Sequence, residues 1–189
     1  MNYLEKIEAK VKAGSIIYID FDDTLIDFIN GWFKNIRHKE LSYLTMLPNK
    51  KDEVDSFRFF KVDKTGAALS SLSNPLVYED IEVLPFANDF IEMIKRRFGD
   101  DSFKIITTSY GESIIEAKNK NLKNLFDIET DKIIHTHYKI DIVKKHILID
   151  DAIHNVKELG DETLVFMPTQ PWNIRYKEKI KINNLSELL

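Results

Sequence analysis

Short apolar runs separated by amphipathic segments constrain the fold of this chain more than any other feature. The runs predict buried strands at Ser15–Ile19, Phe103–Ile106, Lys132–His135, Ile147–Ile149 and Thr163–Phe166. Apolar residues with helical spacing lie between them, notably in Phe86–Phe98, Glu112–Leu125 and Ala152–Leu159. Strands that alternate with helices of this length indicate an α/β fold, in which a parallel sheet carries helices on both faces.

The interval 27–80 interrupts this alternation, because it is rich in aromatic residues and contains no convincing strand. We therefore expect a small helical cap, inserted after the first strand into a core formed by residues 1–26 and 81–189. Its aromatic residues are Phe28, Trp32, Phe33, Tyr43, Phe57, Phe59, Phe60 and Tyr78. Most of them suit the cap's own hydrophobic core. Phe28 and Trp32, just after the first strand, are the candidates for contact with a substrate.

Composition excludes several classes of function. The chain of 189 residues has no cysteine, so disulfides, thiol catalysis and cysteine-based metal sites are absent. Its net charge of −4 argues against nucleic acid held by bulk electrostatics. No apolar run approaches the roughly 20 residues that span a bilayer. The N-terminus has no apolar stretch typical of a signal peptide, so we expect a cytoplasmic protein without a membrane partner.

Carboxylates follow two of the predicted strands. Asp20 and Asp22 come directly after the first strand, and Asp150 and Asp151 follow the fourth. Ligands of open parallel sheets gather outside the carboxyl ends of the strands. Asp20 and Asp22 can point to the same side of an extended backbone, and like charges held together recruit a cation or retain a proton. An all-oxygen ligand set favours Mg²⁺.

Hydroxyl groups follow the second strand at Thr108 and Ser109. They can donate hydrogen bonds to phosphate oxygens at the same edge of the sheet, although residues of this type also cap helices. Asp151 has a similar alternative, since it stands just before the helix expected from Ala152. His135 and His137 alternate like strand residues, and we interpret them as structural.

The motifs resemble those of the haloacid dehalogenase (HAD) superfamily over most of the chain. Asp20-Phe21-Asp22-Asp23-Thr24 after an apolar strand looks like its first motif, Ile105–Ser109 like its second, and Ile147–Asp151 like its fourth. A lysine is expected upstream of the acidic pair, where Lys139 stands. Within the superfamily the chain is most similar to the 5′(3′)-deoxyribonucleotidases, through Leu148–Asp151, Asn155, Gln170–Asn173, Thr108–Ser109 and Tyr78–Pro85. Phe86 departs from the small residue, often glycine, expected after Pro85, and we expect this to alter local packing.

The resemblance implies a role for each matching residue. Asp20 would attack phosphorus and form an aspartyl-phosphate, and Asp22 would act as general acid and base. Thr108, Ser109 and Lys139 would bind the phosphate. Mg²⁺ would be bound by Asp20, by the main-chain carbonyl of Asp22 and by a carboxylate of Asp150 or Asp151, between which the motif does not decide. The substrate would be a nucleoside monophosphate, and a homodimer is plausible.

Three other functions remain to be weighed. A receiver domain of a signalling protein also combines acids, a hydroxyl and a lysine. There, however, the phospho-accepting aspartate ends a later strand, whereas Asp20 and Asp22 come together after the first strand. A HAD phosphatase for another small ester or for a nucleic-acid 3′ end differs only in substrate. A phosphate- or nucleotide-binding module without catalysis is disfavoured, because the acids, Thr108 and Lys139 are all present.

Overall fold

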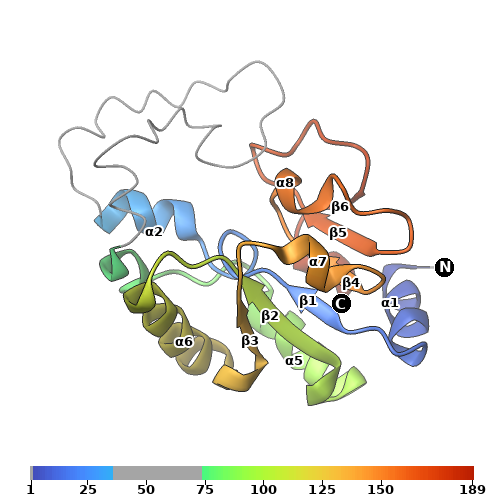
Figure 1. Ribbon diagram of the computed structural model, residues 1–189, viewed down its shortest axis with the longest axis horizontal. Coiled ribbons are helices and arrows are strands. Elements are labelled where there is room, and N and C mark those ends of the chain that lie inside the picture. The colour runs from blue at the N-terminus through green and yellow to red at the C-terminus, as the bar shows by residue number, and fades with distance from the viewer. Residues whose placement is uncertain (1, 36–73) are drawn as a thin grey trace.

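A six-stranded parallel sheet forms the centre of the molecule (Figure 1). The computed structural model describes residues 2–35 and 74–189. In space the strands follow the order β3-β2-β1-β4-β5-β6. Their bounds are β1 Ile17–Ile19, β2 Phe103–Thr107, β3 Ile133–His135, β4 Ile147–Ile149, β5 Leu164–Pro168 and β6 Ile180–Ile182. The predicted α/β class with a parallel sheet is confirmed.

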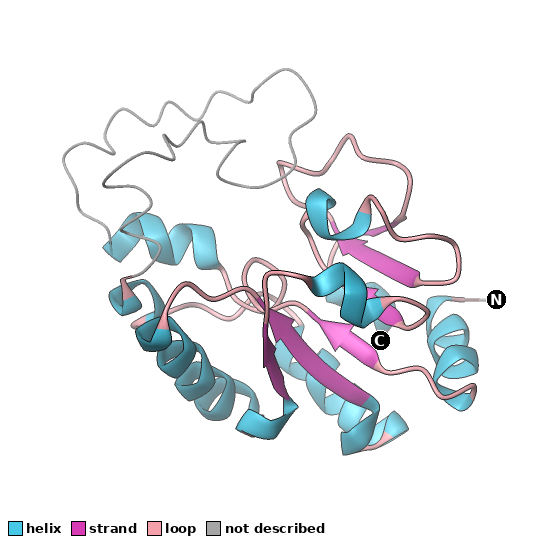
Figure 2. Cartoon of the chain, viewed as in Figure 1, coloured by secondary structure: helices cyan, strands magenta, loops and turns pink. Residues whose placement is uncertain are grey.

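Helices connect the strands and cover the sheet (Figure 2). The α-helices are α1 Tyr3–Lys12, α2 Phe28–Asn35, α5 Ala87–Phe98, α6 Glu112–Phe126, α7 Lys139–Val143 and α8 Ile153–Val156. Short 3₁₀ helices are η2 Pro75–Tyr78, η3 Asp100–Ser102, η4 Thr130–Lys132 and η5 Leu185–Leu188. The helices α5 and α6 were expected, and each differs from the expected range by one residue at one end.

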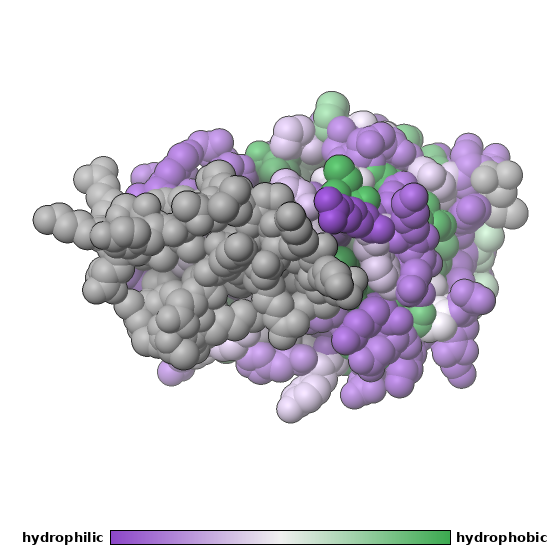
Figure 3. Space-filling view, turned by 90° about the horizontal axis from the view of Figure 1, so that it is seen from above, coloured by the Kyte–Doolittle hydropathy of each residue, from purple (hydrophilic) through white to green (hydrophobic). Residues whose placement is uncertain are grey.

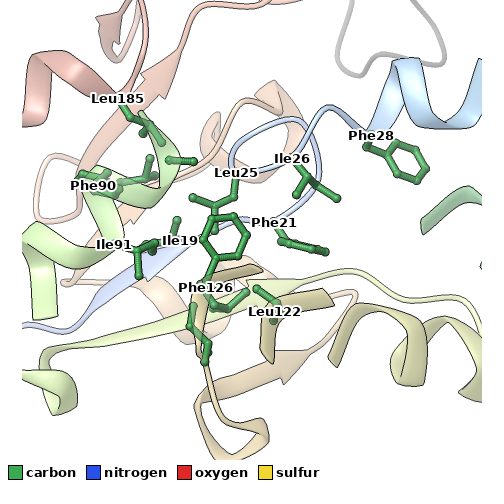
Figure 4. Close-up of a cluster of buried hydrophobic side chains, with 14 of the residues drawn as sticks. Ile19, Phe21, Leu25, Ile26, Phe28, Phe90, Ile91, Leu122, Phe126 and Leu185 are labelled. Carbon is green, nitrogen blue, oxygen red and sulfur yellow. The ribbon is translucent and has the colours of Figure 1, made fainter. Parts of the chain in front are cut away.

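Alternate residues of each strand enter two separate hydrophobic clusters. Ile17 and Ile19 of β1 belong to a cluster that also contains buried residues of α1, α5 and α6, part of which Figure 4 shows. Tyr18, between them, belongs to a second cluster with Val143 of α7 and Val156 of α8. This alternation is the period-two pattern of a strand that is buried on both sides. The predicted helices on both faces are therefore confirmed.

The strand β6 and the α-helix α7 were not predicted, and the helix α8 is shorter than predicted. β6 has only three residues, and its pairing with β5 (Phe166 opposite Ile180) defines it. The five-residue α7 is likewise too short for a periodic signal. α8 ends at Val156 instead of Leu159, since the Leu159 N–H donates to the Val156 carbonyl three residues back, as in a turn.

Only the two ends of the interval 27–80 are described. α2 is helical, as predicted, and Ile29 and Trp32 on it pack into the main hydrophobic cluster together with Val77 of η2. The predictions for Tyr43, Phe57, Phe59 and Phe60 fall outside the described residues. The boundaries of the cap stay a prediction.

Phe86 has a left-handed backbone conformation, with φ +66°, directly before α5. Its side chain is 45% exposed. Left-handed geometry is costly for any residue with a Cβ atom and is readily adopted by glycine. The departure from a small residue therefore acts on backbone conformation, and its effect on local packing stays a prediction.

The described helices show no span that could cross a bilayer: none within residues 2–35 and 74–189 is long and apolar enough. Figure 3 views the molecule from the side above the sheet. Outside the residues drawn in grey, this face is mainly hydrophilic and carries small hydrophobic patches.

Candidate active site

The carboxyl ends of β1 and β4 meet at the centre of the sheet. The two strands pair with Ile19 opposite Ile149, and the Asp20 N–H donates to the Ile149 carbonyl at 2.9 Å. Asp20 and Asp150, the next residue of each strand, consequently lie side by side. The strand order also reverses here, since β2 and β3 lie on one side of β1 and β4 to β6 on the other. Open α/β sheets bind their ligands at such switch points.

Three buried carboxylates share this position with one buried lysine. One oxygen from each of Asp20, Asp150 and Asp151 lies within 4.8 Å of the others. Lys139, the first residue of α7, places its Nζ 2.5 Å from Asp20 Oδ1 and 3.0 Å from Asp150 Oδ2. All four residues are at most 5% exposed. When all three carboxylates are ionised, the single ammonium group leaves a charge of −2, which suits a divalent cation.

The electrostatics of the group point to the same conclusion. Burial raises the pKa of Asp20 to about 7, although Lys139 opposes the rise, and repulsion from Asp150 adds to it. Burial also raises the pKa of Asp151 well above its ordinary value, and Asp150 and Asp20 reinforce this. For Lys139, burial lowers the pKa, but Asp150 and Asp20 outweigh that effect and hold it above its ordinary value. A cation would relieve this repulsion, and Mg²⁺ prefers oxygen ligands of this kind.

The Asp150 carboxylate is fully engaged by its surroundings. Oδ1 accepts from the Ala152 N–H at 2.8 Å, and the Asn155 amide donates to Oδ1 at 3.1 Å and to Oδ2 at 2.9 Å. Lys139 also contacts Oδ2. Both oxygens of Asp150 therefore have close partners within the protein.

The Asp151 carboxylate retains one nearly free oxygen. Oδ2 accepts from the Trp172 indole N–H at 2.6 Å, while Oδ1 has a hydroxyl contact with Thr24 of only 3.4 Å. The Asn173 amide donates to the Asp151 main-chain carbonyl at 2.8 Å. The segment after β5 thus fixes Asp151 from two directions. Since its carboxylate bonds to these side chains, the alternative that Asp151 caps α8 has no support among the hydrogen bonds seen.

Asp22 lies outside the group of three carboxylates. Its Oδ2 is 2.6 Å from Lys118 Nζ, and the Tyr78 hydroxyl lies 3.2 Å from Oδ1 and 3.4 Å from Oδ2. Burial raises the pKa of Tyr78 well above its ordinary value, and Asp22 adds to this, so the hydroxyl keeps its proton and is the donor. The Asp22 side chain remains 24% exposed. The Asp22 carboxylate therefore has hydrogen-bond partners in Lys118 and Tyr78 and is still partly accessible to solvent.

Lys118 is a residue of the site that sequence reasoning missed. It is 1% exposed and comes from the middle of the buried stripe of α6, between Ile114 and Leu122 at intervals of four residues. Its Nζ also donates to Thr107 Oγ1 at 2.8 Å and to the Thr108 carbonyl at 2.5 Å. The signal in the sequence was a lysine at a position where the helical period demands an apolar residue.

Thr108 and Ser109 follow β2 at the same edge of the sheet. The Thr108 hydroxyl donates to the Thr136 carbonyl at 3.1 Å, and Ser109 Oγ lies 2.8 Å from His135 Nδ1. His135 Nε2 is 2.9 Å from Asn119 Oδ1. Neither hydroxyl caps α6, whose N-cap is Gly111 without a side-chain hydrogen bond. Burial, aided by Lys118, lowers the pKa of His135, so the ring is neutral and Ser109 donates to Nδ1.

Phe28 and Trp32 are both part of the hydrophobic core. Trp32 is 0% exposed and Phe28 is 6% exposed. The Phe28 ring centroid lies 5.6 Å from that of Tyr78, and Figure 4 shows Phe28 on α2. This burial agrees with the core interpretation of these aromatic residues. Their contact with a substrate stays a prediction.

Solved structures of HAD-type hydrolases have the same fold at low sequence identity. A HAD hydrolase of family IA, variant 3, from Entamoeba histolytica matches over 93% of this chain and 95% of its own, with a TM-score of 0.54 and 13% identity. The magnesium-bound HAD-hydrolase YfnB from Bacillus subtilis matches over 92% and 96%, with a TM-score of 0.55 and 16% identity. CbbY from Rhodobacter sphaeroides, in complex with phosphate, matches over 92% and 96%, with a TM-score of 0.50 and 12% identity.

Sequence comparison adds nothing to this result, since no protein-family model and no curated protein matches the chain. The structural matches cover nearly the whole length of both chains in each case. The chain therefore has the fold of the HAD-like hydrolases.

Proposed function

We propose that this chain is a Mg²⁺-dependent phosphoric monoester hydrolase that acts on nucleoside monophosphates through a covalent aspartyl-phosphate. The observation that carries the proposal is the buried contact of Lys139 with Asp20, beside Asp150 and Asp151, at the switch point of the sheet. A carboxylate nucleophile needs charge compensation before it can approach a phosphate dianion. Lys139 together with a divalent cation supplies it.

The first step is attack on phosphorus. A carboxylate oxygen of Asp20 forms the new bond, the ester P–O bond breaks, and its electron pair leaves with the ester oxygen. Asp22 gives that oxygen a proton. In the second step, water attacks the phosphorus and gives a proton to Asp22. The bond to Asp20 then breaks, which releases inorganic phosphate, restores the Asp20 carboxylate and leaves Asp22 protonated, as at the start.

Phosphate binding is assigned to Thr108, Ser109 and Lys139. Thr108 and Ser109 lie at the end of β2, next to β1 in the sheet, so their hydroxyls approach the same edge as Asp20. In the structure each hydroxyl has an acceptor within the protein, Thr136 or His135. Both groups must turn toward a bound phosphate to donate to it.

The metal ligands are assigned to Asp20, Asp151 and the main-chain carbonyl of Asp22. Asp151 is preferred to Asp150 because its Oδ1 has only the long Thr24 contact, whereas both oxygens of Asp150 are engaged. Mg²⁺ held by these residues would neutralise charge on the nucleophile and the phosphate. Magnesium in YfnB and phosphate in CbbY are properties of those proteins, which share the fold and are consistent with this assignment.

The choice of nucleotides as substrates rests on the deoxyribonucleotidase-like segment Gln170–Asn173 and on Asn155. The structure gives both a physical task, since Asn155 holds Asp150, and Trp172 and Asn173 hold Asp151. The residues that resemble this family thus support the proposed metal site. A homodimer remains a proposal that follows from the same resemblance, and a cytoplasmic location remains a proposal that follows from the composition of the chain.

The test is phosphate release from a panel of 5′- and 3′-nucleoside monophosphates, in Mg²⁺ and in EDTA, with Asp20→Asn in parallel. We expect metal-dependent release from some nucleotides, reduced by a factor of about 10³ or more in the variant. Release from small generic esters alone would overturn the nucleotide assignment. Activity that survives both EDTA and Asp20→Asn would overturn the proposed site, and a protein that releases nothing would favour a binding module.

A further inference from the structure

The buried lysine of α6 sets Asp22 apart from the other acids of the site. Asp20, Asp150 and Asp151 gather around Lys139, whereas Asp22 has its own cation in Lys118 at 2.6 Å. The two lysines come from different helices, α6 and α7. The site therefore divides its carboxylates between two fixed positive charges.

All three N–H groups of the Lys118 ammonium have acceptors. These are Asp22 Oδ2, Thr107 Oγ1 at 2.8 Å and the Thr108 carbonyl at 2.5 Å. An ammonium group has three donors, so this set is complete. Lys118 therefore has no N–H left for a substrate phosphate. Its position in the site is that of a support for another residue.

A lysine at this position needs a reason beyond packing. Its neighbours in the buried stripe of α6 are Ile114, Leu122 and Phe126, and an apolar residue would continue the stripe. Burial of an ammonium group costs several kcal/mol unless a partner compensates for it. Lys118 is 1% exposed and has one carboxylate partner, Asp22, among the described residues. The feature that it serves is therefore Asp22.

Tyr78 completes the support from a second direction. Its hydroxyl donates to Asp22, and its ring centroid lies 5.5 Å from Lys118 Nζ. The ring itself is buried, with an exposed fraction of 4%, and is stacked against Phe21 with centroids 6.5 Å apart. Tyr78 thus contacts both members of the ion pair from a rigid position.

We propose that Lys118 and Tyr78 are positioning residues that hold the Asp22 side chain apart from the three carboxylates of Asp20, Asp150 and Asp151. In that position Asp22 serves as the acid that protonates the leaving group. A free carboxylate two residues from Asp20 would compete for the cation. The ion pair with Lys118 removes that competition, and the Tyr78 hydroxyl fixes the orientation of the group. The inference rests on the proposed phosphatase function and adds to it the means by which one acid is separated from the rest.

The test uses two substrates that differ in their need for a proton. The ribose oxygen of a nucleoside monophosphate must be protonated as it leaves, whereas p-nitrophenolate leaves without protonation. We compare kcat/KM, which reports the formation of the aspartyl-phosphate, in Lys118→Met and Tyr78→Phe. Lys120→Met is the matched control, since Lys120 is exposed on the same helix.

We expect Lys118→Met to lower kcat/KM for the nucleotide by roughly 10²-fold and for p-nitrophenyl phosphate by less than about tenfold, because general acid catalysis contributes factors of this size. Tyr78→Phe should show the same selectivity to a smaller extent. In an Asp22→Asn background, Lys118→Met should cost nothing more for the nucleotide, because both changes remove one function.

Three outcomes would overturn the inference: equal losses for both substrates, no loss, or additive losses in the double variant. If Lys118→Met does not fold, Tyr78→Phe tests the inference instead. Its ratio of kcat/KM for the nucleotide to kcat/KM for p-nitrophenyl phosphate is then compared with the wild-type ratio. An active wild type with inactive Asp20→Asn, but without the substrate selectivity, would leave the proposed function standing and remove only the role of Lys118. A wild type that hydrolyses neither substrate would overturn both.

Discussion

Asp20→Asn is expected to stabilise the protein in the absence of metal, and increasingly so as the pH rises. Burial raises the pKa of Asp20 from its ordinary value of 3.8 to about 7 in the folded chain. At about 1.36 kcal/mol for each pKa unit, ionisation of this group at pH 8 costs the folded state about 4 kcal/mol. Asparagine has nearly the same shape and carries no charge, so it avoids that cost.

The direction of the pH dependence follows from proton binding. Between pH 3.8 and about 7 the folded chain holds a proton on Asp20 that the unfolded chain has released. Stability due to this group therefore falls as the pH rises through that window and is level above it. The advantage of Asp20→Asn over wild type should grow by about 2 to 3 kcal/mol between pH 5 and pH 8.

The assay is urea unfolding followed by circular dichroism, in EDTA, at pH 5, 6, 7 and 8. The difference between variant and wild type removes the contribution of groups that do not interact with Asp20. Asp141→Asn is the control. Asp141 is 77% exposed, and its ion pair with Lys144, at 3.4 Å, is on the surface, so the difference in unfolding free energy between this variant and wild type should stay near zero at every pH. Parallel stability curves for wild type and Asp20→Asn would refute the reasoning. With Mg²⁺ in excess, wild type should gain stability and the variant far less.

Three other changes test particular contacts. Phe86→Gly should raise the free energy of unfolding by about 0.5 to 1 kcal/mol, because it relieves a left-handed φ of +66°. Phe86→Ala keeps a Cβ atom and should bring no such gain. Urea unfolding measures both variants, and an equal gain in the two would contradict the strain argument. Trp172→Phe removes the indole N–H that donates to Asp151. The Mg²⁺ concentration needed for half-maximal thermal stabilisation should therefore rise about 10- to 100-fold, and an unchanged value would contradict the support that this hydrogen bond gives to a metal site at Asp151. His135 should titrate by NMR below its ordinary pKa of 6.5, so acidification through that range destabilises the fold, and a value above 6.5 would contradict the neutral ring beside Ser109.

Much of the fold could be predicted from local patterns in the sequence. The apolar runs that form β1, β2 and β4 are legible because a strand buried on both sides is a continuous apolar stretch. Asp20 and Asp150 could be placed together because the carboxyl ends of parallel strands share one edge, and the observed pairing of Ile19 with Ile149 agrees with this. Each strand, and the polar residue that follows it, can be recognised from residues that are close in the chain.

Packing decided the rest, because a buried polar side chain gains its meaning from a partner far away in the chain. In the sequence Lys118 is one of several lysines of α6, and nothing near it in the chain identifies its partner. The rotation of that helix against the sheet brings its ammonium group to Asp22, 96 residues earlier. In the sequence His135 has only the pattern of a strand residue. In the structure Asn119 of α6 and Ser109, two residues after β2, contact its ring.

The choice between Asp150 and Asp151 shows the same limit. In the sequence they are two equal carboxylates at neighbouring positions. Their environments differ because Asn155 comes from α8 and Trp172 from the segment after β5, and only the folded arrangement sets one carboxylate against each. The sequence by itself determined which residues end the strands. The tertiary structure decided which atom of each remains free to bind, since that depends on contacts no local pattern encodes.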